Sequence, residues 1–158
     1  MEKRYTLDEA HKEFAVKSNG RVWQLLEKTH RTQQEDDELL HAVHASSYHW
    51  QKIGTGVHQQ RAEYLIAKAY LALDVSERAL HHAQRCMALT EAHRDQMQDF
   101  DLAYAHECLA RSLAAVDRRV EAVQHYQQAR ALGDQIKAAG DKETFDQDFQ
   151  ANAWYGIA

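Results

Sequence analysis

The 158-residue chain contains no proline and only six glycines. Both residues interrupt helices, so their scarcity removes most of the usual breaks between helical segments. Ala, Leu, Gln, Glu and Arg, which lose least on entering a helix, make up a large share of the chain. The composition predicts an all-α protein, and its length suits a single domain with its own core.

Long apolar runs are also missing. No stretch approaches the roughly 18 apolar residues needed to span a bilayer, and the N-terminal MEKRYTLDEAHKEF lacks an apolar signal region. We therefore expect a cytoplasmic protein with no membrane partner. Nineteen Lys and Arg stand against 24 Asp and Glu, and neither sign forms a long block, so nucleic acid is not an expected partner either.

Motifs of catalysis and cofactor binding are absent as well. The sequence has no GxSxG, no GxxxxGK[ST], no GxGxxG and no HExxH, and Gly54-Thr55-Gly56 follows a predicted helix rather than a strand. We predict no cofactor, no bound metal and no catalytic residue. The two cysteines, Cys86 and Cys108, lack CxxC spacing, so we expect them to pack as small apolar residues without a disulfide.

The start of two helices can be placed from capping boxes. Thr6 with Glu9, and Thr32 with Glu35, have the spacing in which a hydroxyl and a carboxylate satisfy free backbone amides. Gly20 could kink the first helix, because glycine costs about 1 kcal/mol relative to alanine inside a helix. Apolar periodicity and turn residues then predict about seven helices, over residues 7–28, 33–53, 57–73, 76–93, 98–116, 118–138 and 141–151.

The middle of the chain contains an internal repeat. YLIAKAYLALDVSERALHHAQRCMAL aligns with ECLARSLAAVDRRVEAVQHYQQARAL at a separation of 43 residues, the distance from Ile66 to Leu109. The alignment also pairs Asp74 with Asp117. Small residues such as Ala67 recur at equivalent positions, where they let helix backbones approach closely.

These residues resemble the tetratricopeptide repeat (TPR), in which Ala, an aromatic residue and a second Ala recur along the second helix. Ala122, Tyr126 and Ala129 match that pattern here. The 43-residue spacing exceeds the TPR period of about 34, and the proline after the second helix is missing. The resemblance implies antiparallel hairpins stacked into a short right-handed superhelix, with an N-terminal helix pair (1–56), two repeats (57–97 and 98–140) and a C-terminal cap (141–158).

The resemblance also implies a concave groove lined by the first helix of each repeat. The positions of the TPR groove correspond here to Arg61, Tyr64, Lys68, Tyr104, Glu107 and Arg111. This mixture of aromatic and charged groups suits a protein or peptide segment, with arginine pairing to carboxylates. Alternatively, Arg61 or Arg111 pairs with Glu63 or Glu107 across neighbouring helices of the same chain. The interpretation is a non-enzymatic protein-interaction domain, and Tyr64 and Cys108 depart from the pattern by which some TPR domains bind chaperone C-termini.

A cluster of histidines supports the alternative interpretation. HAVHASSYHW places His41, His44 and His49 on one predicted helix, but at 100° per residue they point in different directions, which disfavours a metal site. A small-molecule or metal-dependent enzyme remains the alternative function. Its polar site would combine His44, His49, His58, Asp99 and Asp101, near Glu107, if the first helices of adjacent repeats lie side by side.

The last 14 residues carry more apolar surface than a free tail would tolerate. They include Phe145, Phe149, Trp154, Tyr155 and Ile157. We expect this segment either to cover the last helical hairpin of the same chain or to join two chains in a homodimer.

Overall fold

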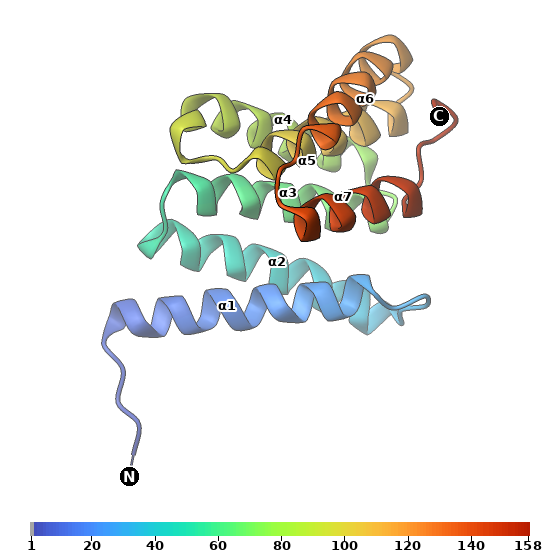
Figure 1. Cartoon of the computed structure of the whole chain (residues 1–158). Coiled ribbons are helices and arrows are strands. Elements are labelled where there is room, and N and C mark those ends of the chain that lie inside the picture. Colours follow the sequence, from blue (N-terminus) through green and yellow to red (C-terminus); the bar gives the residue numbers. More distant parts are fainter. Residues whose placement is uncertain (1) are drawn as a thin grey trace.

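The computed structural model describes residues 2–158, and in that part of the chain helices are the sole regular secondary structure, with no strand (Figure 1). Its elements are α1 (Leu7–Leu26), α2 (Gln33–Ile53), α3 (Gly56–Ala72), α4 (Ser76–Ala92), the short 3-10 helix η1 (Arg94–Gln96), α5 (Asp99–Ala115), α6 (Arg119–Asp134) and α7 (Ala139–Ala151). The all-α prediction is confirmed. Each α-helix begins within two residues of its predicted start.

Both predicted capping boxes form. Glu9 N donates to Thr6 Oγ1 at 3.2 Å while Thr6 N donates to Glu9 Oε2 at 2.8 Å, and Thr32 and Glu35 make the same reciprocal pair at the start of α2. The helix α1 passes Gly20 without a break. Ala15, Val22 and Leu25 are buried on its inner side, and this packing offsets the cost of the glycine.

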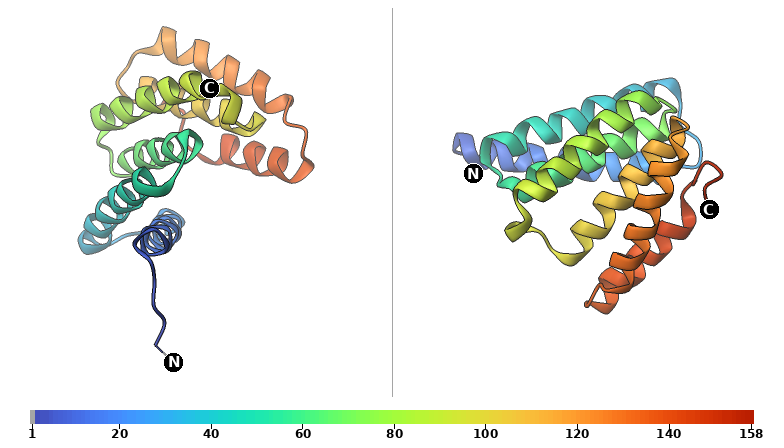
Figure 2. Two further views of the ribbon diagram at one scale, coloured as in Figure 1. Left: turned by 90° about the vertical axis from the view of Figure 1, so that its left-hand side faces the viewer. Right: turned by 90° about the horizontal axis from the view of Figure 1, so that it is seen from above.

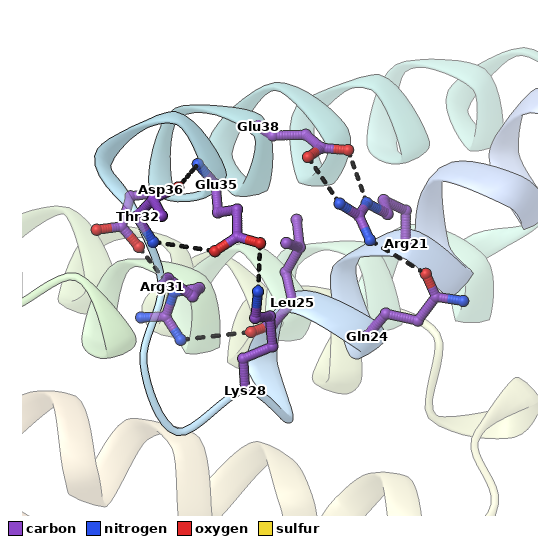
Figure 3. A network of polar contacts seen from close by, with 9 residues as sticks. All are labelled: Arg21, Gln24, Leu25, Lys28, Arg31, Thr32, Glu35, Asp36 and Glu38. Carbon is purple, nitrogen blue, oxygen red and sulfur yellow. Dashed lines mark hydrogen bonds and ion pairs between the residues drawn. The ribbon is translucent and has the colours of Figure 1, made fainter.

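Charged side chains tie the α1–α2 connection together (Figure 3). Arg21 donates through Nε and Nη2 to the two carboxylate oxygens of Glu38, at 2.6 and 2.9 Å. Arg31 pairs with Asp36 at 2.7 Å, and Lys28 pairs with Glu35. Arg31 also donates to the carbonyl of Ala72 at 3.2 Å, which attaches this loop to the end of α3.

The two aligned repeats turn in the same way. Asp74 and Asp117 both have left-handed backbone angles, with φ of 58° and 62°. The amide after each aspartate bonds back to an equivalent carbonyl, Val75 N to Tyr70 O and Arg118 N to Leu113 O, both at 2.9 Å. Aspartate is among the few residues that tolerate this conformation, which here ends the first helix of each hairpin. Val75 occupies the N-cap position of α4.

The hairpins α1–α2, α3–α4 and α5–α6 stack in chain order, and α7 returns beside α5 and α6 (Figure 2). The odd-numbered helices touch one another in succession, α1 with α3, α3 with α5 and α5 with α7. They therefore form one layer, which we call the inner face. The buried core comprises three clusters, one with Val22, Leu39 and Ile66, one around Leu109 and one around Phe145.

Candidate functional site

A cavity of about 440 Å³ opens where four helices of the inner face meet. We call it the inner cavity. Residues of α1, α3, α5 and α7 contribute to its wall, so it exists only because the stacked hairpins bring these helices together. Its lining consists of Asn19, Trp23, Gln60, Arg61, Tyr64, Leu65, Phe100, Asp101, Tyr104, Thr144 and Asp148. Three of the six predicted groove residues, Arg61, Tyr64 and Tyr104, are among them.

Arg61 is held by a bidentate pair rather than left free. Its Nε and Nη2 donate to the two oxygens of Asp101, each at 2.8 Å, and its guanidinium lies 5.1 Å from the ring centre of Phe100. Asp101 is only 3% exposed and also accepts a bond from Gln98 N at the start of α5. The hydrogen bond to Asp101 raises the pKa of Arg61. Arg61 thus pairs across neighbouring helices, but with Asp101 and not with Glu63 or Glu107; Glu63 accepts from His82 and Arg85 of α4.

Two tyrosines form the centre of the inner cavity. The rings of Tyr64 and Tyr104 meet edge to face with centres 5.5 Å apart. The Tyr104 hydroxyl donates to Asp148 Oδ2 at 2.6 Å. Burial, this hydrogen bond and the negative charge of Asp148 together raise the pKa of Tyr104, and burial followed by the charge of Glu107 raises the pKa of Tyr64. Both phenols therefore stay protonated at neutral pH.

Lys68 lies farther along α3, beside a smaller cavity of about 200 Å³ that shares Tyr64 with the inner cavity. Its ammonium is 5.8 Å from the ring centre of Trp23, and the side chain is half-buried. Trp23 thus both contacts the Lys68 ammonium and lines the inner cavity. Lys68 keeps the position that the repeat alignment predicted for it, on the inner face.

Glu107 and Arg111 differ from the expected open groove. They are 2% and 4% exposed and pair with each other within α5. The Arg111 guanidinium also donates to the carbonyls of Ala153, Asp148 and Phe149, at 2.6, 3.3 and 3.1 Å, and lies 3.7 Å from the ring centre of Trp154. The C-terminal segment covers this part of the inner face. The prediction that Glu107 and Arg111 line an open groove is therefore wrong, because they pair with each other and with the C-terminal segment.

The segment that covers them is itself well packed. Phe145 is buried against Gly133 of α6, and Phe149 and Trp154 surround Tyr126 with ring centres 5.1 and 4.7 Å away. The Trp154 indole N–H donates to the carbonyl of Phe149 at 2.9 Å, which closes the end of α7. The aromatic residues of the C-terminus therefore contact the same chain.

The structure separates the residues of the predicted polar site. His44 bonds to the Tyr70 hydroxyl (3.1 Å), His49 to His11 (2.8 Å), and His58 to Thr55 (3.1 Å) while stacking on Trp50. Asp99 accepts from Lys137 N (2.9 Å), and Asp101 pairs with Arg61. These five side chains do not converge as the enzyme interpretation required. Within residues 2–158, no three His, Cys, Asp or Glu side chains are grouped so that they could hold a metal ion.

Burial sets the protonation of these histidines and of the cysteines. It lowers the pKa of His44, His49 and His58, so each favours its neutral form. Cys86 and Cys108 are free and buried, and burial raises the pKa of both thiols. Neither thiol has the lowered pKa that a cysteine nucleophile needs.

Several residues of the inner cavity were not identified from the sequence. Trp23 comes from α1, Thr144 and Asp148 from α7, and Phe100 from the first turn of α5. All lie outside the groove positions of the aligned repeat. The one available signal in the sequence was the large aromatic ring of Trp23 among the apolar residues Val22 and Leu25 of the first predicted helix.

Comparison of the chain with models of known families, with curated proteins and with solved structures finds no match in any of the three. Among the helices of residues 2–158, none combines the length and apolar character that crossing a membrane requires.

Proposed function

We propose that this chain is a TPR-like, non-enzymatic protein-interaction domain that binds a segment of a partner protein at the inner cavity. The observation that carries the proposal is the convergence of four aromatic side chains on one concave site. Trp23, Tyr64, Phe100 and Tyr104 come from three different helices and line the same cavity. Aromatic side chains supply much of the binding energy at protein interfaces because they offer large, rigid apolar surfaces.

The size and setting of the cavity also support a side-chain ligand. A volume of about 440 Å³ lies within the range of sites that bind small molecules, and it accommodates one or two peptide side chains. The cavity is partly open and lies on the inner face, so a chain passing along that face can insert a side chain. Arg61 pairs with Asp101 and Arg111 pairs with Glu107 within the chain. Aromatic contacts, rather than pairs between these arginines and carboxylates of the partner, are therefore the main source of affinity.

Selection from a random displayed peptide library tests the proposal. Wild-type protein is expected to enrich peptides that compete with one another for one site. Thr144→Trp places a large ring at the mouth of the cavity from an exposed position on α7, and it should remove the binding of those peptides. Glu143→Trp adds the same ring at the neighbouring exposed position, which does not line the cavity, and should leave binding intact.

The thermal midpoints of both variants are measured as a control for folding. Both should match wild type, because each substitution changes only an exposed side chain. Failure to enrich any peptide would contradict the proposal. Equal binding of the enriched peptides to Thr144→Trp and wild type would also contradict it, because the site would then lie elsewhere on the molecule.

A further inference from the structure

Gln60 lines the inner cavity, and its side-chain amide oxygen accepts no hydrogen bond from the described residues. Gln60 is 2% exposed, and its Nε2 donates to Thr90 Oγ1 at 3.0 Å. The Thr90 hydroxyl in turn donates to Cys86 O at 2.8 Å, so it can only accept from Gln60, and the orientation of the amide is fixed. No described residue donates to Gln60 Oε1. Oε1 therefore has free acceptor capacity on a side chain of the cavity wall.

Asp148 supplies a second acceptor, and it is charged. One of its oxygens accepts from the Tyr104 hydroxyl, and the carboxylate has no cationic partner within residues 2–158. The bond from Tyr104 fixes the carboxylate at the wall of the cavity. A half-buried carboxylate without a cation favours a positively charged ligand.

The balance of charges on the cavity wall also favours a positively charged ligand. Arg61 and Asp101 neutralise each other through their bidentate pair, which leaves Asp148 as the uncompensated charge of the lining. The ring faces are suited to cations, because two of them already contact cations of the chain. Arg61 lies over Phe100 and Lys68 over Trp23, at 5.1 and 5.8 Å. The rings of Tyr64 and Tyr104 have no such partner among the described residues.

We propose that the inner cavity binds the cationic end of an arginine or lysine side chain of the partner segment. The cation lies against Tyr64 and Tyr104, pairs with Asp148 and donates a hydrogen bond to Gln60 Oε1. This inference rests on the proposed function, since it names the chemistry of the side chain that a bound segment inserts.

Five peptide pools with a random background test the inference. The central residue is fixed as arginine, lysine, citrulline, norleucine or glutamate, and capture by immobilised protein is measured for each pool. Citrulline has the shape of arginine without its charge, and norleucine tests apolar insertion alone. We expect the arginine and lysine pools to bind about tenfold more tightly than the citrulline and glutamate pools. Added salt should weaken the arginine pool and leave the norleucine pool unchanged.

Two variants of α7 locate the effect. Asp148→Asn keeps the shape of the side chain and should abolish the preference for arginine over citrulline. Asp146→Asn removes a carboxylate two residues away, which pairs with Lys142 outside the cavity, and should leave the preference intact. The salt dependence of the unmodified protein decides the matter if Asp148→Asn does not fold.

The outcomes separate this inference from the proposed function. Tightest binding of the norleucine or glutamate pool would overturn the cation inference while the peptide-binding function stands. Equal binding of the arginine and citrulline pools would do the same. If the wild-type protein captures none of the pools better than the blocked variant Thr144→Trp does, both the cation inference and the peptide-binding function are overturned.

Discussion

Lys68 and Arg111 occupy the same position in the two aligned repeats, 43 residues apart, and both line the smaller cavity, yet they differ in burial and in bonding partners. Lys68 is half-buried, with its ammonium over Trp23 and no carboxylate partner among the described residues. Arg111 is 4% exposed and bonded to Glu107, to three carbonyls and to the face of Trp154. One position of the repeat thus gives a free cation in one hairpin and a buried structural cation in the next.

The difference lies in what covers each hairpin. The inner face of α3 is left open beside the inner cavity, whereas the inner side of α5 near Arg111 is covered by α7 and the residues after it. The C-terminal end of α7 has carbonyls without helical partners, and Arg111 supplies donors to them. The comparison teaches that the groove positions of a repeat are available for binding only where no other part of the chain covers them.

The largest expected effect is a difference in stability between variants of Arg111 and of Lys68. Arg111→Met should lower the free energy of unfolding by about 3–5 kcal/mol, because it leaves Glu107 buried without a partner and the α7 carbonyls without donors. Lys68→Met should change it by about 0.5 kcal/mol or less, since its environment is partly exposed. Chemical denaturation of both variants measures the difference.

A double variant sharpens this test. Adding Glu107→Met to Arg111→Met removes the unpaired buried charge, and part of the lost stability should return. Equal stability of Arg111→Met and Lys68→Met would show that the covered half of the inner face is not held by Arg111.

A smaller effect is expected where the covering segment touches α6. A Cβ at Gly133 would lie 2.2 Å from Cε1 of the buried Phe145, so Gly133→Ala should cost about 1–3 kcal/mol by displacing α7. Gly140→Ala is the matched control, because nothing lies within 4 Å of a Cβ there. It should stabilise the helix slightly, by about 0.5–1 kcal/mol. Thermal melts that rank the two variants in the opposite order would place Phe145 elsewhere.

The smallest expected effect concerns acid and the α5–α6 hairpin. Burial, the neighbouring His125 and Arg94 lower the pKa of His106 to about 4, from the usual 6.5, and the two imidazoles meet at 2.9 Å. Between pH 6.5 and 4 the unfolded chain takes up a proton that folded His106 does not, so stability should fall as the pH falls through this window. His106→Gln should make that fall shallower.

The exposed His81 on α4 provides the control for this pH dependence. His81→Gln should keep the wild-type slope of thermal midpoint against pH. An identical slope in His106→Gln and wild type would show that His106 is not buried in its neutral form.

Much of the fold could be predicted because its signals are local. Thr6 and Thr32 mark helix starts through contacts three residues away, and the aligned Asp74 and Asp117 fix equivalent turns of two hairpins. The repeat register also placed Arg61, Tyr64, Lys68 and Tyr104 on one face. These are consequences of helical geometry, which the sequence pattern carries directly.

The rest of the site depends on contacts between distant segments. Burial of Arg111 requires the last residues of the chain to fold back onto α5, which no local pattern specifies. Trp23 and Asp148 come from helices outside the aligned repeat, so no register could place them. The expected pairing of Arg61 with Glu63 or Glu107 across neighbouring helices was wrong, because Asp101 at the start of α5 is the carboxylate that faces Arg61.

The most direct test of the account uses the three tryptophans as reporters. Trp23 lines the inner cavity, Trp154 lies in the covered half over Arg111, and Trp50 stacks on His58 and does not line the inner cavity. Their indole N–H signals can be followed in a ¹⁵N-labelled sample during titration with an arginine-centred peptide. The account predicts a saturable shift of the Trp23 signal while the Trp154 signal stays in place. A shift of Trp154 with Trp23 unmoved would contradict it, because the peptide would then bind by displacing the C-terminal segment.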